Sequence, residues 1–408
     1  LQTFWHVQKS VLSPQHHVQN EAGHLLKNSS DTIIAPLPEE GMAACLLVLE
    51  DTLRLKEWLA YHYTVLPLSR LIIALDPLTS TRAIRRIHHM ADQYNQLKVN
   101  VTIWTKDSFL RPKLRDLVNH KFNSYRAHKK RQEHFVSACM KEHQRQNASW
   151  VILTDTDEFL SFNYIGEGES YDRYDEILKW KPRSKINEDR EKAKPIRERL
   201  PPIINQTIGS FLDQLKEQTA ANQTYPRCYR IPGLGFPGSE NATIADILPL
   251  LSKQALGIAK LETLMSLAHR EHERKHGSFS KAMMDVSRIK TSDLDVRHAQ
   301  TIHNPSRRVC GKYQYGSGQD YLSSIFRLHH HVGTRASFVE RSGRDRRPKD
   351  IETLYQIKKD KWKPYGSDRT IVTWINKFVN LVGSEMAQTL LLDFNDTQLA
   401  ERYGSLKL

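Results

Sequence analysis

Three carboxylates follow a short apolar run near the middle of the chain. Residues 150–153 (Trp-Val-Ile-Leu) have the composition of a buried strand, and Asp155, Asp157 and Glu158 come directly after it. Carboxylates without partners are costly to bury, so we expect them to face a crevice. Both side chains of an Asp-x-Asp pair in an extended segment lie on one side and can approach one hard divalent cation. Acidic residues after a strand also cap turns and helices, and this alternative stays open.

Two histidines in the C-terminal half are candidates for a further metal ligand. Carboxylate with imidazole is a ligand set that Mn²⁺ accepts, and Mg²⁺ is the alternative ion. We expect Asp157 to bind the cation directly and Asp155 to bind it directly, through water or beside a ribose. His303 and His330 are the candidates for the third position. Such a cation would carry a diphosphate.

Transfer of a group from a diphosphate needs cations near the phosphates and, if the reaction inverts configuration, a base near the acceptor hydroxyl. Lys281 and Arg288 are candidates for the cations, although a solvated surface explains either of them equally well. Glu158 and Glu240 are the candidates for the base, and Glu240 follows an open Gly/Pro-rich loop. A retaining reaction would need no such base.

Apolar segments typical of buried strands alternate with segments of helical spacing. This alternation predicts an α/β fold with a mostly parallel sheet and right-handed crossovers. Glu50 and Asp76 then follow adjacent strands, where a crevice of such a sheet receives a nucleotide. The predicted strands are 43–49, 71–75, 99–104 and 150–153, and the predicted helices are 52–66, 81–95, 128–146 and 208–215.

Other parts of the chain have distinct patterns. Residues 1–40 are polar and irregular and predict an extended stem, and the densely charged residues 165–203 predict a surface insertion. Trp58, Tyr61 and His62 share one face of the helix after the first strand, which is the pattern of core packing. The last 40 residues predict an amphipathic helix with one apolar face, formed by Ile371, Ile375, Phe378, Val379 and Val382.

Composition narrows the class of protein. With 408 residues, 39% hydrophobic and 26% charged, the chain can bury a full core in one large domain or two. The net charge of +14 suits nucleic acid, an anionic membrane or anionic substrates. We expect no nucleic-acid partner, because recognition helices, zinc-finger spacing and aromatic RNA-binding strands are missing from the sequence. No apolar run approaches the length of a membrane span, and we expect that any N-terminal anchor has been removed.

Cysteines and glycosylation sequons point to the secretory pathway. Four cysteines are too few for a disulfide scaffold. Cys228 and Cys310 could pair in an oxidising lumen, whereas Cys45 and Cys139 lie in apolar patterns and are expected to be core thiols. Six Asn-x-Ser/Thr sequons outside the predicted strands favour passage through that pathway. They are Asn28, Asn147, Asn205, Asn222, Asn241 and Asn395.

The order of these motifs resembles that of a known enzyme family. Residues 50–62 (Glu-Asp-x-x-Arg-x-x-Glu-Trp-Leu-Ala-Tyr-His), then Asp76, then residues 155–159 (Asp-x-Asp-Glu-Phe) resemble glycosyltransferase family 92 and its eukaryotic, algal-type relatives, which have the GT-A fold. Residues 281–289, 301–303 and 329–333 look like later motifs of the same group, so the likeness runs from about 43 to 345. Relatives often have His-Tyr where this chain has His330-His331, and this departure leaves open which histidine serves the site.

The resemblance implies a Rossmann-like sheet flanked by helices, with a catalytic domain over 41–350, a smaller C-terminal acceptor-side region and a helical extension over 351–408. It implies a metal-dependent, inverting transfer of a sugar from a UDP- or GDP-linked donor to a glycan or glycoprotein acceptor. The enzyme would be a type II membrane protein in the Golgi lumen. Carried over by position, Asp155 and Asp157 hold Mn²⁺, Asp76 faces the nucleoside and Lys281 faces phosphate.

Two other functions fit the acidic motif. A divalent-metal phosphohydrolase or nucleotidyltransferase also uses acidic pairs at strand ends, but it usually needs further carboxylates for a second metal. A secreted, non-enzymatic carbohydrate-binding protein could hold a structural Ca²⁺ with the same residues. The sequence names neither the sugar, nor the acceptor, nor the oligomeric state.

Overall fold

A computed structural model gives the arrangement of most of the chain. The chain divides into two units, Leu1–Ile33 and Ile34–Leu408, and every residue described here belongs to the second. The predicted stem (1–40) and the predicted insertion (165–203) lie outside the described residues. These are 41–122, 124–163, 207–219, 226–236, 248–256, 280–296, 324–331, 372–391 and 394–404, with the short stretches or single positions 258, 270–271, 310, 315–316, 338, 353, 355–356 and 364–366.

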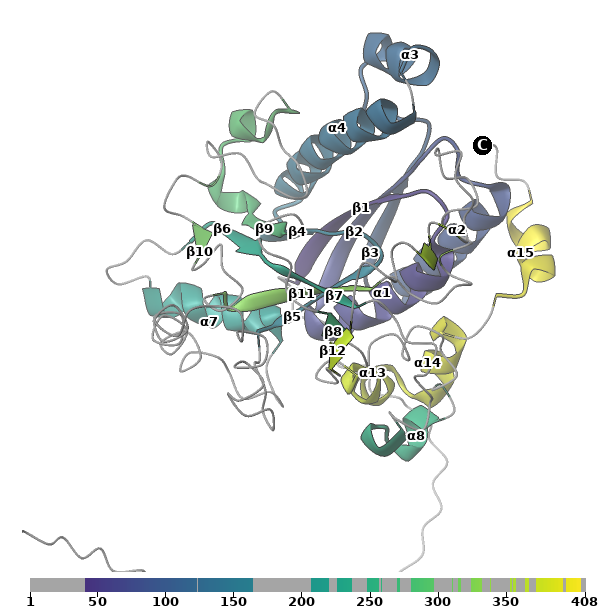
Figure 1. Cartoon of the computed structure of the whole chain (residues 1–408), viewed down its shortest axis with the longest axis vertical. Helices are drawn as coiled ribbons and strands as arrows, with labels where there is room; N and C mark the ends of the chain where they lie inside the picture. The colour runs from purple at the N-terminus through teal and green to yellow at the C-terminus, as the bar shows by residue number, and fades with distance from the viewer. Residues whose placement is uncertain are drawn as a thin grey trace, which may run out of the picture. The chain divides into compact units, whose positions relative to one another are not determined.

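The main sheet has seven strands in the order β10-β6-β9-β4-β1-β2-β3 (Figure 1). Six run parallel, and β9 runs antiparallel between β6 and β4. The predicted α/β fold with a mostly parallel sheet is therefore confirmed. The strands are β1 (Met42–Val48), β2 (Leu68–Leu75), β3 (Asn100–Trp104), β4 (Trp150–Leu153), β6 (Cys228–Ile231), β9 (Lys281–Asp285) and β10 (Tyr315–Gly316).

Helices cover both faces of this sheet, because the strands are apolar on both faces. In β1, Ala44 and Leu46 pack into the core under α1 and α2, whereas Ala43 and Cys45 face the core under α4. The helices are α1 (Thr52–Val65), α2 (Thr81–Gln96), α3 (Pro112–His120), α4 (Ser124–Arg145), α7 (Ile208–Thr219), α8 (Lys253–Leu256), α13 (Trp374–Val382), α14 (Ser384–Leu391) and α15 (Asp396–Tyr403), with 3₁₀ turns η2 (Leu248–Leu250), η3 (Val286–Arg288) and η4 (Thr291–Leu294).

A second sheet has three strands in the order β5-β11-β7, and the chain enters it directly from β4 of the first sheet. The chain leaves β4, passes through residues 154–157 and enters β5, so the acidic loop connects the two sheets. β11 lies between antiparallel β5 and parallel β7. The strands are β5 (Glu158–Phe162), β7 (Gly233–Phe236) and β11 (Phe326–His331), and a separate pair is formed by β8 (Arg270–Glu271) and β12 (Pro364–Gly366).

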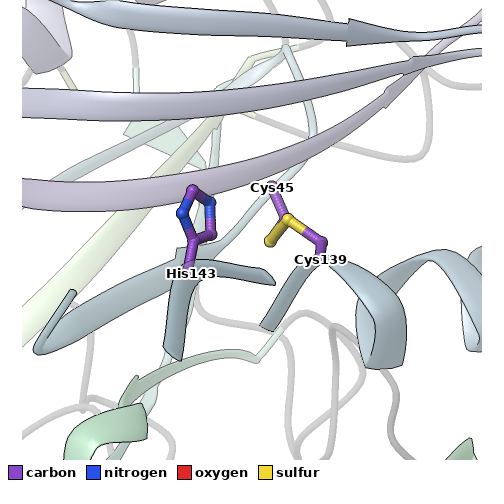
Figure 2. Close-up of side chains that lie close together, drawn as sticks. All are labelled: Cys45, Cys139 and His143. Carbon is purple, nitrogen blue, oxygen red and sulfur yellow. A yellow bond between two sulfur atoms is a disulfide. The ribbon is translucent and has the colours of Figure 1, made fainter. Parts of the chain in front are cut away.

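All four cysteines form disulfides. Cys228 pairs with Cys310, as the sequence suggested. Cys45 pairs with Cys139, so the expectation of two core thiols is wrong. Cys45 on β1 and Cys139 on α4 do lie in apolar patterns, but the packing of α4 on β1 brings the two sulfur atoms together (Figure 2). Two disulfides are compatible with a secretory location.

The C-terminal region is three short helices, not the single amphipathic helix that the sequence predicted. Gly383 ends α13 with a φ of 84°, a backbone conformation that residues other than glycine rarely adopt. Ile375, Phe378, Val379 and Val382 are buried as predicted, whereas Ile371 lies outside the described residues. No helix in the described part of the chain is long and apolar enough to cross a membrane.

Candidate metal and nucleotide site

The acidic loop lies at the carboxyl end of β4, above the first turn of α1. Asp157 and Glu158 are buried, whereas the side chain of Asp155 is 44% exposed. The loop is held in place by β11, since the amide of His331 donates a hydrogen bond to the carbonyl of Asp157 at 2.9 Å. The side chain of Asp155 is thus open to solvent, whereas the carboxylates of Asp157 and Glu158 turn inward.

Arg54, in the first turn of α1, neutralises part of this charge. Its guanidinium is fully buried, and Nη1 lies 3.2 Å from Oδ2 of Asp157. Nη1 also donates to the carbonyl of His331 at 3.1 Å. Asp51 lies on the other side of Arg54, 3.8 Å from Nε, and accepts a 2.6 Å hydrogen bond from the hydroxyl of Thr156. Arg54 therefore ties α1, the acidic loop and β11 together.

Lys281, at the start of β9, neutralises the remaining carboxylates. Its ammonium is fully buried, lies 2.8 Å from Oε2 of Glu158 and donates a hydrogen bond to Asp155. Burial opposes the charge of Lys281, but Asp155 and Glu158 outweigh it and raise the pKa of the lysine. Burial raises the pKa of Glu158 to about 7, although the ammonium of Lys281 acts in the opposite direction. Lys281 was predicted to face phosphate; it instead contacts the protein's own carboxylates.

The strand geometry of β11 distinguishes the three histidines of the run 329–331. Side chains alternate along a strand, so His330 points away from the other two. Nε2 of His330 lies 3.3 Å from Oδ2 of Asp157. The rings of His329 and His331 stack on Phe236 inside the protein, at 4.6 and 4.5 Å between centroids. Of the three histidines, His330 is the one beside the acidic loop.

These side chains have the spacing of a metal site. Ligand atoms of Asp157, Glu158 and His330 all lie within 4.8 Å of one another. With every carboxylate ionised, four negative charges meet the two positive charges of Arg54 and Lys281, which leaves an excess that one divalent cation would balance. Glu158 binds Lys281 and the amide of Asp155, and Asp157 binds Arg54, so each carboxylate already has a protein partner; Asp157 and His330 are the carboxylate and the imidazole that lie 3.3 Å apart. The donor set of carboxylate and imidazole fits Mn²⁺ better than Ca²⁺.

Glu50 and Asp76 lie together, because they follow neighbouring strands: Val48 of β1 pairs with Leu75 of β2. Both carboxylates are buried and accept hydrogen bonds from the protein. Glu50 accepts hydrogen bonds from the amide and hydroxyl of Ser80, at 2.7 and 2.8 Å. Asp76 accepts from the amide of Leu78 at 3.1 Å.

Asp76 also faces α4. Its Oδ2 lies 3.9 Å from both Nδ1 of His128 and Nη1 of Arg131. Arg131 in turn donates to Asp107 at 2.9 Å. The buried carboxylate of Asp76 therefore links the end of β2 to α4, at the sheet edge where the sequence predicted a nucleotide.

One predicted site residue in the described part of the chain, Arg288, is not brought to this edge. Arg288 lies in η3, beyond the far end of β9, because the antiparallel pairing sets Asp285 opposite Trp150 and Ala282 opposite Leu153. Glu240 and His303 lie outside the described residues. Arg54 and Asp51 belong to the site, but the sequence analysis assigned them no role. The available signal was a basic residue among apolar neighbours in the first turn of a buried helix.

A second group with metal-ligand spacing consists of Cys45, Cys139 and His143. The two sulfur atoms are joined in a disulfide, and the ring of His143 lies beside it (Figure 2). Nε2 of His143 lies 3.0 Å from the carbonyl of Ala44, and burial lowers the pKa of the histidine to about 4. We interpret this group as a structural junction between α4 and β1.

No protein-family model and no curated protein sequence matches the chain.

Proposed function

We propose that this chain is a metal-dependent glycosyltransferase of GT-A type, which moves a sugar from a nucleoside-diphosphate sugar to a glycan or glycoprotein acceptor. The observation that carries the proposal is the charge arrangement of the acidic loop. Asp157 and His330 lie 3.3 Å apart at the carboxyl edge of a mostly parallel sheet, in a cluster whose carboxylates outnumber its cations. Such an edge is where α/β sheets receive nucleotides.

Each residue has a role in this proposal. Asp157 and His330 would hold Mn²⁺ or Mg²⁺, with Asp155 reaching the same ion from its exposed position. The ion would supply Lewis-acid neutralisation of the diphosphate. Glu50 and Asp76 would border the nucleoside, with Asp76 positioned by Arg131. Arg54 and Lys281 are positioning residues, because they hold the carboxylates at fixed places.

Glu158 is assigned a positioning role rather than that of a base. Its carboxylate is buried against Lys281 and the amide of Asp155, so an acceptor hydroxyl has no access to it. Glu240 remains the candidate base if the reaction inverts. The Golgi lumen is the proposed location, in agreement with the sequons and the two disulfides.

Calorimetry with UDP and with GDP, each in Mn²⁺ and in EDTA, tests the proposal. We expect binding in Mn²⁺ and at least tenfold weaker binding in EDTA, because the acidic loop repels a diphosphate unless a cation intervenes. Asp157→Asn should abolish the Mn²⁺ dependence, whereas Asp396→Asn, a matched exposed change on α15, should leave it intact. Equal affinity with and without metal would refute the site. Release of inorganic phosphate from simple phosphate esters, without nucleotide binding, would favour the phosphohydrolase alternative.

A further inference from the structure

Part of the positive charge of this protein is concentrated in one helical hairpin. Residues 106–134, which cover α3 and the first half of α4, contain nine Lys and Arg against three Asp and Glu, an excess of six charges in a chain whose net charge is +14. Six of these cations have exposed side chains. We name them the α3–α4 basic surface: Lys106, Arg111, Lys113, Lys121, Arg126 and Lys129.

Most of these cations form no ion pair within the described part of the chain. Among the described residues, no ion pair involves Lys106, Arg111, Lys113, Lys121 or Lys129. Some exposed cations elsewhere do have such partners. Arg82 binds Asp396, and Arg145, near the opposite end of α4, binds Glu142. The lack of internal compensation leaves the basic surface available to an external anion.

The underside of the hairpin is apolar, which fixes the outward direction of the charges. Leu110, Val118 and Ala127 form a small buried cluster between α3 and α4. Figure 1 shows α3 beside one end of α4. Arg126 and Lys129, three positions apart on α4, stand about 5–6 Å from each other, and the other four cations lie between residues 106 and 121, on α3 and on either side of it.

The basic surface adjoins the proposed donor site. His128 and Arg131, from the same part of α4, lie 3.9 Å from Asp76 at the end of β2. β2 and β4 both flank β1 and lie about 10 Å apart across the sheet, and Leu153 at the end of β4 is level with Ile72, three residues before the end of β2. An extended ligand on the hairpin would therefore reach the proposed centre of transfer.

We propose that the α3–α4 basic surface binds an anionic glycan, one whose sugars carry carboxylate or sulfate groups, as the acceptor. The role of this glycan as acceptor rests on the proposed transferase function. Binding of the glycan to the surface does not depend on that function. A polyanionic glycan matches the separate exposed cations of the α3–α4 basic surface, because the charges of such a glycan repeat along a hydrophilic chain.

Two other polyanions fit the surface less well. A membrane-binding helix presents large apolar side chains beside its cations, but the exposed large hydrophobic residues of the described chain are Leu78 and Leu256, both outside the hairpin. Single-stranded nucleic acid is bound by stacking on aromatic rings. Phe109 packs against Phe135, and the ring of Phe122 lies under Arg126, 4.2 Å from its guanidinium.

Binding of defined oligosaccharides to the whole chain tests this inference. The probes are a sulfated, a carboxylated and a neutral oligosaccharide of equal length. Lys113→Gln, Lys121→Gln and Lys129→Gln are combined in one variant. The matched control combines Lys98→Gln, Lys253→Gln and Lys290→Gln, which removes the same charge from exposed lysines elsewhere.

We expect the wild type to bind at least one anionic probe and not the neutral probe, with affinity that falls as salt rises. The hairpin variant should bind on the order of tenfold or more weakly, with a smaller salt dependence, because each lost contact removes about one unit of that dependence. The control variant should stay within about twofold of the wild type. Equal losses of glycan affinity in the hairpin variant and the control variant would refute binding at the α3–α4 basic surface.

Tighter binding of an oligonucleotide or of phosphatidylserine vesicles than of either anionic glycan would also overturn the inference. The nucleotide calorimetry separates its failure from that of the proposed function. Loss of glycan binding with intact Mn²⁺-dependent nucleotide binding would refute this inference alone. If the chain binds the glycan but no nucleotide, the proposed transferase function is refuted, and the inference that the α3–α4 basic surface binds an anionic glycan stands.

Discussion

Ion pairs occur in two different settings in this protein. Lys281 and Arg54 are fully buried and neutralise the carboxylates of the acidic loop. Arg82, on α2, is 65% exposed and binds Asp396 of α15, which is 38% exposed. The chemical groups are the same, but water replaces a lost partner only at the surface. Buried cations thus hold the shape of the candidate site, whereas the exposed pair merely attaches a helix.

The largest expected effect is that of Lys281→Met. Removal of the ammonium leaves Glu158 buried without its charged partner, and breaking a buried pair costs about 3–5 kcal/mol of unfolding free energy. Arg82→Met, the matched control, should cost about 1 kcal/mol or less, because exposed pairs contribute little. Urea denaturation of both variants measures the difference. Similar losses in the two variants would mean that Lys281 is not a structural counter-charge.

The second effect concerns a buried group that must stay neutral. Nδ1–H of His62 donates to the carbonyl of Trp58, and Nε2 accepts from the amide of Leu160, so protonation breaks a hydrogen bond as well as burying charge. Burial lowers the pKa of His62 to about 3. The unfolded chain therefore takes up a proton first as the pH falls below about 6.5, and the folded state loses about 1.4 kcal/mol per pH unit.

His62→Gln isolates this contribution. Glu158, whose pKa is raised, has the opposite sign, since falling pH between about 7 and 4.5 favours the folded state through that group. We therefore compare the pH dependence of the variant with that of the wild type between pH 7 and 4. The variant should lose the steep His62 component, and exposed His120→Gln should not. A variant with the wild-type slope would contradict a neutral buried His62.

The smallest expected effect is that of Asp396→Asn. Hydrogen bonds from Arg86 lower the pKa of Asp396, so its contribution to stability is present above about pH 4 and is lost as the pH falls further. The substitution should cost about 1 kcal/mol at pH 7 in low salt. Half-molar salt should shrink this loss, because the carboxylate of Asp396 is 38% exposed and is screened although its partner Arg86 is buried, but should not shrink the loss in Lys281→Met. A salt-independent loss at Asp396 would remove the distinction between the two settings.

Local patterns predicted most of the described α/β core. Residues 43–49, 71–75 and 150–153 form strands at nearly the predicted positions, because strands buried on both faces are continuous apolar runs. The position of Asp157 at a strand end also followed from the sequence. The boundaries of the C-terminal helices did not, since the effect of Gly383 depends on the backbone angles that packing imposes.

The sequence by itself determined the alternation of strands and helices and the acidic residues at the strand end. Tertiary structure alone decided which cations neutralise them and which histidine lies beside Asp157. Lys281 and Asp155 are 126 residues apart, and Arg54 and His331 are 277 apart. The disulfide between Cys45 and Cys139 spans 94 residues. Such contacts depend on the strand order and on the packing of α1 and α4 against the sheet, and short-range spacing carries no information about either.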